Sequence, residues 1–463
     1  MTLRFTPISE IQKAYEQQRL LSNQRVINTP KQRIEQLKRL RKSIAKYEAE
    51  LLEALKTDLG KSNYEGFLTE VGVTYQEIDF HIKNVKEWSA HRRIQTPYFL
   101  LPSSSKVIPE PFGQVLIMAP WNYPFQLLMN PLIGALSAGN RAILRPSPEV
   151  PHVAEVIGKV VAEAFTNEEV FVAQGSIEEN QWLLQQQWDY IFFTGGPFLG
   201  KIVAKAAAEK LIPVTLELGG KSPAVVAVDA NMRVAARRIA NSKFSNAGQM
   251  CVAPDYVLVP TAFKQTLIDE LIKAIQQFYG EDTEASSGYG KIINEKQWQR
   301  LVGYLQDGTV VHGGKSNAAS LFIEPTILTD VSVDSKIMQD EIFGPILPIL
   351  TYDTNEEALA IINRHPNPLA FYVFTNNAAS EQYWLTNVPS GGACVNNTSW
   401  HLTNHALPFG GRGFSGMGGY HGKLSFDTFS HIKSVMKTPT WLDPDLKYPP
   451  YKGKGWLLKK LIG

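Results

Sequence analysis

Short apolar segments alternate with helix-like stretches from about Val107 onward, and this alternation constrains the fold more than any other feature of the chain. The first apolar segments are QVLIMAP, RAILRP, VFVAQG, YIFFTGG and VTLELGG. Such alternation is typical of a parallel sheet covered by helices, because parallel strands must be joined by long crossover connections. The sequence therefore predicts an α/β fold that begins with a Rossmann-like unit.

A second series of the same kind follows Pro223. Its apolar segments are PAVVAV, DYVLVP, FIEPTIL, PILPIL, LAFYVF and GACVNN. Residues from about Pro30 to Lys86 instead carry leucine and isoleucine at three- and four-residue spacing between charges, which predicts amphipathic helices. A chain of 463 residues is too long for one hydrophobic core. We therefore expect two α/β units, with the N-terminal helices packed on the first.

The composition argues against several classes of protein. The 46 lysine and arginine residues nearly balance the 44 acidic residues, so no field of one sign predicts a nucleic-acid partner. The chain has only two cysteines, Cys251 and Cys394, which is typical of a reducing compartment rather than of a disulfide scaffold. The start shows no export signal, and we expect a cytoplasmic protein. The histidines lack metal-ligand spacing, and we expect no catalytic metal.

Two short segments near the middle of the chain combine a carboxylate with a thiol. The segment LELGGKSP places Glu217 in a glycine-rich turn, and NAGQMCVAP places Cys251 among small residues. A thiol with a nearby carboxylate is a candidate nucleophile with a candidate base. Taken alone, Cys251 is also consistent with a buried structural thiol. Glu217 is also consistent with a helix-capping residue or an ion pair beside Lys221.

Together with PWNYP at Pro120–Pro124 and EIFGP at Glu341–Pro345, these segments resemble the NAD(P)-dependent aldehyde dehydrogenase superfamily. The resemblance extends from about Lys31 to about Lys437. The segment Leu407–His431 is most similar to the class 3 or fatty-aldehyde branch. The family fold implies a Rossmann-like cofactor domain, a second α/β catalytic domain and a small bridging and oligomerisation segment. The expected limits are 1–92 and 112–219 for the cofactor domain, 220–414 for the catalytic domain, 93–111 and 430–440 for the bridging strands, and 441–463 for a tail.

The resemblance also implies catalytic roles. Cys251 corresponds to the nucleophile, which attacks an aldehyde to give a thiohemiacetal whose hydride passes to nicotinamide. Glu217 corresponds to the base that activates water against the resulting thioester. Asn122 corresponds to the oxyanion-hole amide. An acylating relative, with another acceptor for the thioester, and a catalytically silent protein on the same fold are the alternatives. The presence of Glu217 argues against the acylating relative, and the presence of all three residues argues against the silent protein.

The cofactor is expected at the Gly-rich turn TGGPFLG, where glycines precede a helix-like stretch. The resemblance implies that NAD or NADP contacts Trp121, Arg145, Ser147, Thr194, Gly195, Gly196, Leu218, Glu341 and Phe343. Relatives usually carry a glutamate where this chain has Pro148. The loss of that carboxylate, with Arg145 nearby, predicts that NADP is accepted as well as NAD. The alternative is that Glu149 takes over the glutamate's role.

Aromatic residues predict the substrate class. Tyr123, Trp400 and Phe409, with Trp121, would line a tunnel for apolar aldehydes: medium- or long-chain aliphatic, aromatic or apocarotenoid. The tail YPPYKGKGWLLKKLIG combines lysines with Trp456, Leu457, Leu458, Leu461 and Ile462. This pattern suits peripheral contact with a membrane surface, and it suits a partner subunit equally. We expect a homodimer by analogy with the class 3 branch.

Overall fold

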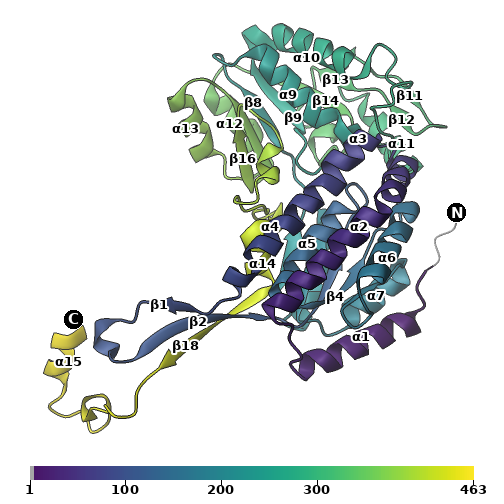
Figure 1. The fold of residues 1–463 in the computed structure, drawn as a ribbon. Coiled ribbons are helices and arrows are strands. Elements are labelled where there is room, and N and C mark those ends of the chain that lie inside the picture. The colour runs from purple at the N-terminus through teal and green to yellow at the C-terminus, as the bar shows by residue number, and fades with distance from the viewer. Residues whose placement is uncertain (1–4, 463) are drawn as a thin grey trace.

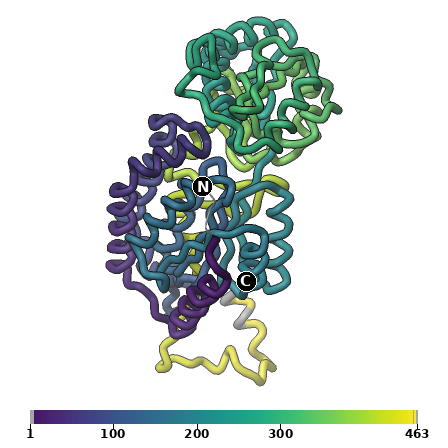
Figure 2. The backbone as a smooth tube through the Cα atoms, turned by 90° about the vertical axis from the view of Figure 1, so that its right-hand side faces the viewer, coloured from purple at the N-terminus to yellow at the C-terminus, as the bar shows by residue number. Residues whose placement is uncertain are grey.

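A computed structural model describes residues 5–462, which form two α/β lobes and a projecting arm (Figure 1). Figure 2 shows the lobes from the side, with the second half of the chain in green above the first half in purple and teal. The α/β fold with a Rossmann-like unit is as the sequence predicts.

The N-terminal helices cover one side of the first lobe. They are α1 (Ile8–Asn23), α2 (Pro30–Leu59), α3 (Asn63–Gly66), a π-helical turn (Phe67–Val71) and α4 (Gly72–Trp88). Helix α2 begins at a capping box between Thr29 and Gln32, with Pro30 in the first turn. It ends where Gly60 adopts φ 72°, a left-handed conformation that glycine tolerates. Its buried leucines pack towards α6 and α4.

The first sheet has six strands in the order β17-β7-β6-β3-β4-β5, all parallel except the edge strand β17. The strands are β3 (Gln114–Met118), β4 (Arg141–Arg145), β5 (Val170–Val172), β6 (Tyr190–Thr194), β7 (Val214–Glu217) and β17 (Gly416–Met417). The connecting helices are α5 (Gln126–Ala138), α6 (Pro151–Ala164), α7 (Ile177–Gln185) and α8 (Pro197–Glu209). Strands β3 and β6 are wholly buried, as helices on both faces require.

The second sheet has seven strands in the order β10-β13-β14-β9-β8-β15-β16, with only β10 antiparallel. The strands are β8 (Pro223–Val226), β9 (Tyr256–Pro260), β10 (Thr309–His312), β13 (Thr326–Thr329), β14 (Ile346–Tyr352), β15 (Ala370–Phe374) and β16 (Gly392–Val395). The helices are α9 (Met232–Phe244), α10 (Lys264–Tyr279), α11 (Glu295–Tyr304), α12 (Asn355–Ile362) and α13 (Ala378–Asn387). A two-stranded ribbon, β11 (Ser316–Asn317) with β12 (Phe322–Ile323), lies beside it.

The arm is a three-stranded antiparallel sheet in the order β1-β2-β18. Strand β2 (Ser104–Pro111) pairs along its whole length with β18 (Ser430–Lys437), and β1 (Arg92–Ile94) flanks β2. Helix α14 (Gly422–Thr428) precedes β18 and returns to the first lobe against α5. The tail ends in α15 (Gly455–Ile462), near the tip of the arm (Figure 1). Among residues 5–462, no helix has the length and apolar character needed to cross a membrane.

Candidate active site

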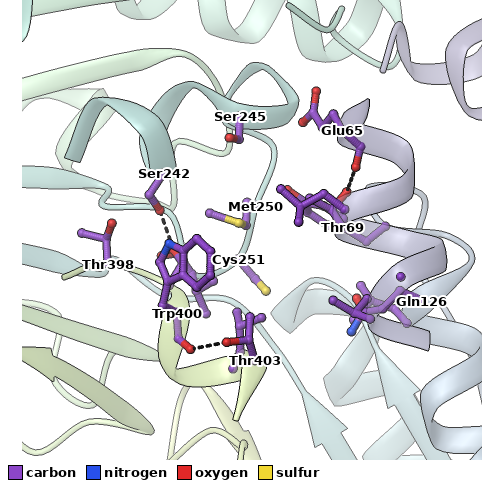
Figure 3. A pocket seen from close by; sticks show the side chains of 18 of the residues that line it. Glu65, Thr69, Gln126, Ser242, Ser245, Met250, Cys251, Thr398, Trp400 and Thr403 are labelled. Carbon is purple, nitrogen blue, oxygen red and sulfur yellow. Dashed lines mark hydrogen bonds between the residues drawn. The ribbon is translucent and has the colours of Figure 1, made fainter. Parts of the chain in front are cut away.

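A cavity of about 810 Å³ is lined by residues of both lobes. Its walls come from α3, the π-helical turn, α4, α5, α9, α10 and the loops after β7 and β16. Seven of the predicted site residues line it: Cys251, Glu217, Tyr123, Leu218, Thr194, Trp400 and Phe409. Figure 3 shows Cys251 between a wall with Trp400 and Thr398 and an opposite wall with Thr69 and Gln126. The fold thus brings the candidate nucleophile, base and aromatic walls together.

Cys251 lies in the loop between the short 3-10 helix Ser245–Gly248 and β9. Its backbone enters through Gly248, where a Cβ would lie 2.2 Å from the Gly344 carbonyl oxygen. Burial raises the pKa of the Cys251 thiol to about 12, and the negative charges of Glu341 and Glu217 act in the same direction. The free protein therefore holds Cys251 as a neutral thiol at neutral pH.

Glu217 is the last residue of β7, at the carboxyl edge of the first sheet. Its side chain is buried, and within residues 5–462 neither carboxylate oxygen has a hydrogen-bond partner. Burial raises the pKa of Glu217 well above its ordinary value. The ion pair with Lys221 that the sequence left open is absent, because Lys221 binds Asp255 at 2.5 Å. Glu217 thus faces the cavity as a group that can take a proton.

Asn122 lies in the turn after β3 and packs against the nucleophile's loop. Its Nδ2 donates to the Gln249 carbonyl at 3.1 Å. The backbone carbonyl of Asn122 accepts hydrogen bonds from Asn246 Nδ2 and from Lys61 Nζ, both at 2.9 Å. Asn122 is 2% exposed, and it is not among the described residues that line the cavity. One amide hydrogen of Asn122 is thus engaged by the loop that carries Cys251.

Several predicted cofactor residues end the strands of the first sheet, where ligands bind in open α/β folds. Thr194 ends β6 and Arg145 ends β4. In the described part of the chain, Thr194 Oγ1 and Arg145 Nε are buried without a hydrogen-bond partner. Burial also lowers the pKa of Arg145 to about 10. These unsatisfied groups fit a polar ligand such as a dinucleotide.

The glycine turn fits the same ligand. Gly195 donates its backbone N–H to the Glu217 carbonyl at 3.0 Å, and Gly196 is the N-cap of α8. Among the described residues, a Cβ built at Gly196 would meet nothing within 4 Å, so a ligand can approach the helix N-terminus closely. Ser147 Oγ accepts a long bond from the Glu149 backbone at 3.4 Å.

Glu149 itself points elsewhere. Its Oε2 accepts a hydrogen bond from Asn294 Nδ2 at 2.9 Å, at the start of α11 in the second lobe. Its negative charge also acts on Arg145 and opposes the effect of burial on the pKa of that side chain.

The remaining predicted residues lie at the junction of the lobes. Trp121 and Phe343 pack edge to face, with ring centroids 5.4 Å apart. The Glu341 carboxylate lies against Gly219, where a Cβ would sit 1.9 Å from Oε2, so a larger residue there would require the Glu341 side chain to shift. Burial raises the pKa of Glu341 well above its ordinary value, with Asp255 adding to the shift.

Sequence reasoning missed a buried ion pair beneath the site. Lys61 Nζ lies 2.6 Å from Glu70 Oε1, and both side chains are fully buried. Glu70 Oε2 accepts the backbone N–H groups of Phe125 and Gln126 at the start of α5. No sequence signal separates these two residues from the many charges on neighbouring helices, because only the tertiary fold buries them.

Most of the chain matches known proteins. The model of the aldehyde dehydrogenase family matches residues 9–435. The chain belongs to the aldehyde dehydrogenase family. A 4,4'-diaponeurosporen-aldehyde dehydrogenase of Staphylococcus aureus is 49% identical over 91% of this chain and 92% of its own length. A dimeric NADP-preferring aldehyde dehydrogenase of Canis lupus familiaris is 41% identical over 91% of this chain and 94% of its own length.

Solved structures agree with this assignment. The substrate-bound state of Staphylococcus aureus AldH superposes with a TM-score of 0.95 at 46% identity, covering 99% of this chain and all of that one. An NAD+ complex of an aldehyde dehydrogenase from Bacillus cereus gives a TM-score of 0.80 at 27% identity, over 89% of this chain and 84% of that one. The predictions of an NAD(P)-dependent aldehyde dehydrogenase, of its fold and of the class 3 branch are confirmed.

Proposed function

We propose that this aldehyde dehydrogenase uses Cys251 as nucleophile, Glu217 as base and Asn122 as oxyanion donor. The observation that carries the proposal is the cavity that Cys251 and the buried carboxylate of Glu217 line together. The Cys251 thiol releases its proton to solvent, the thiolate sulfur attacks the aldehyde carbon, and Asn122 donates its remaining amide hydrogen to the oxyanion. Bound NAD or NADP supplies the hydride acceptor. Glu217 then removes a proton from the water that hydrolyses the thioester.

We propose that the substrates are apolar aldehydes of medium or greater length. The mouth of the cavity carries exposed apolar side chains: Tyr64 (79% exposed), Phe67 (44%), Leu68 (48%) and Trp400 (55%). Tyr123 and Phe409 are buried within it. The S. aureus relative is named for an apocarotenoid aldehyde, which is a long apolar substrate. The apolar part of such a substrate would be buried against these side chains while its carbonyl group reaches Cys251.

For the cofactor, we propose that NADP and NAD are both efficient. Arg145 offers a donor for a 2′-phosphate, and Asn294 donates a hydrogen bond to Glu149. The Canis lupus familiaris relative is named NADP-preferring, and the Bacillus cereus structure is an NAD+ complex. The remaining assigned contacts, at Trp121, Ser147, Leu218, Glu341 and Phe343, belong to the same proposal.

We further propose that the arm joins two copies of the chain into a homodimer. The arm projects from the first lobe (Figure 1). Its apolar side chains Ile94, Ile432 and Met436 are exposed. Beyond it, Trp441 and Trp456 are 75% and 67% exposed. A partner subunit or a membrane surface would cover such residues. The side chains of Leu457, Leu458, Leu461 and Ile462 lie outside the part that the structure describes. The domain limits and the cytoplasmic location stay predictions.

The test is an assay of cofactor reduction with the purified chain and saturated aldehydes of increasing length. We expect kcat/KM to rise with chain length and activity to vanish in Cys251→Ala. A preference for short charged semialdehydes would contradict the substrate class. Retained turnover in Cys251→Ala would contradict the assignment of the nucleophile.

A further inference from the structure

We infer that Glu65 is a positioning residue that holds the nucleophile's loop in a strained conformation. The inference deepens the role proposed for Cys251 and rests on it. Glu65 lies on α3, far from Cys251 in the sequence, and neither the motifs nor the family's catalytic residues include it.

The loop before Cys251 has an unusual backbone. Asn246 (φ 50°, ψ 34°) and Ala247 (φ 51°, ψ 36°) both adopt the left-handed conformation, and Gly248 (φ 75°) follows them. This region is sparsely populated by residues with a Cβ, because the Cβ approaches a backbone carbonyl oxygen. Ala247 carries no polar side chain that could offset the strain. Such a conformation persists only where surrounding contacts enforce it.

Glu65 supplies a contact of that kind from the opposite side of the cavity. Its Oε1 accepts the backbone N–H of Asn246 at 2.8 Å, across 181 residues of sequence. A hydrogen bond to a carboxylate is shorter and stronger than one between neutral groups. Asn246 is the first left-handed residue, so this bond fixes the point at which the chain turns towards Cys251.

Glu65 is itself firmly held. Its backbone N–H donates to Ser62 Oγ at 3.1 Å, and its carbonyl accepts from Thr69 Oγ1 at 2.7 Å, the bond drawn in Figure 3. Figure 3 also shows Glu65 on the helical wall that faces Ser245 and Met250. The carboxylate is therefore presented to the loop from a fixed support.

The segment that carries Glu65 also holds the turn at Asn122, the proposed oxyanion donor. Lys61, four residues before Glu65, donates Nζ to the Asn122 carbonyl at 2.9 Å. Asn246 Nδ2 donates to that carbonyl as well, at 2.9 Å. The segment Lys61–Glu65 thus fixes the Asn122 turn and the Cys251 loop relative to each other. Glu65 acts on Cys251 through the backbone of Asn246, and it leaves the cofactor-binding edge of the first sheet untouched.

The experiment compares two substitutions of nearly equal size in the full-length chain. Glu65→Gln keeps an oxygen that accepts the Asn246 N–H, whereas Glu65→Met removes it. We expect Glu65→Met to slow the single-turnover burst of reduced cofactor at least tenfold, because misplacement of a reacting group by about 1 Å costs on the order of 10²-fold in rate. Glu65→Gln should stay within about threefold of the unmodified chain, a small effect on the same scale. The dissociation constant for NADP, measured by fluorescence, should not change in either variant.

A second variant makes the test specific for strain. Glycine adopts the left-handed conformation at no steric cost, so adding Ala247→Gly to Glu65→Met should restore part of the burst rate. If Glu65→Met alone does not fold, the burst rate of the double variant is compared with that of the unmodified chain instead. The matched control is Glu48→Met, which removes a carboxylate that accepts one hydrogen bond, from Tyr75 at 2.8 Å, on a helix away from the loop. Glu48→Met should leave the burst unchanged.

The inference is overturned by any of three results. The first is a normal burst rate in Glu65→Met. The second is a burst rate in Glu65→Gln as low as in Glu65→Met. The third is no increase in the burst rate when Ala247→Gly is added to Glu65→Met. Failure of the proposed nucleophile would be recognised separately, by turnover in Cys251→Ala.

Discussion

Replacing Glu217 with glutamine should separate hydride transfer from thioester hydrolysis. In the part of the chain described here, neither carboxylate oxygen of Glu217 accepts a hydrogen bond, so the substitution breaks no such contact. The side chain is 2% exposed, and glutamine has nearly the same volume. We therefore expect the free energy of unfolding to change by less than about 1 kcal/mol, as for substitutions without a cavity or a lost partner.

The kinetic effect should be much larger. Burial raises the pKa of Glu217 well above its ordinary value, which makes it a stronger base than an exposed carboxylate. General base catalysis contributes roughly 10²–10⁴-fold, which is about 3–5 kcal/mol at about 1.4 kcal/mol per tenfold. Steady turnover of Glu217→Gln should fall by that factor. A burst of about one reduced cofactor per site should remain, because hydride transfer precedes the hydrolytic step.

Stopped-flow absorbance of the reduced nicotinamide measures both phases, with Glu48→Gln as a control for loss of a carboxylate elsewhere. Hydroxylamine attacks thioesters without a base and should restore turnover in Glu217→Gln. Absence of a burst would place Glu217 in an earlier step. Unchanged steady turnover would remove it from the mechanism altogether.

Four further results are expected. Cys251→Ala should lose dehydrogenase activity and keep its affinity for NADP in a fluorescence titration; weaker NADP binding would place Cys251 in the cofactor site. Because the pKa of Cys251 is raised to about 12, its thiolate fraction rises tenfold per pH unit below that value. Alkylation of the free protein by iodoacetamide, corrected with Cys251→Ala, should therefore climb from pH 7 to 9 without a plateau. The kcat/KM ratio for NADP over NAD should lie within about tenfold of one, or about 1.4 kcal/mol; Asn294→Ser, which keeps a helix cap but releases Glu149, should move it towards NAD. Truncation after Thr440 should preserve activity on short aldehydes but weaken activity on long aldehydes or binding to anionic lipid vesicles. If the truncated chain equals the full chain in activity on long aldehydes, in vesicle binding and in dimer mass, the tail is a passive extension.

Most of the architecture could be predicted because its signals are local. The apolar segments before Gly196 and Gly219 are buried strands of parallel sheets, and their length and β-branched content are legible in the sequence. The pairing of β2 with β18 is different, because it joins segments more than 300 residues apart whose side chains are mostly exposed or half-buried. No periodicity in either strand identifies its partner. Only the resemblance to a family indicated bridging strands at those positions.

The site divides in the same way. Cys251 and Glu217 belong to short motifs that can be recognised from the residues next to them in the sequence. The fold places both in one cavity. Glu65 and Lys61 have no such motif, since each looks like an ordinary charge near the end of a helix. Their importance comes from what lies across the cavity, the Asn246 N–H and the Asn122 carbonyl. Residues that hold a reacting group in place act through backbone atoms of other segments, and backbone atoms are the same at every position. A positioning residue of this kind therefore leaves its evidence in the tertiary structure, where the strained turn at Asn246 and Ala247 marks the place to look.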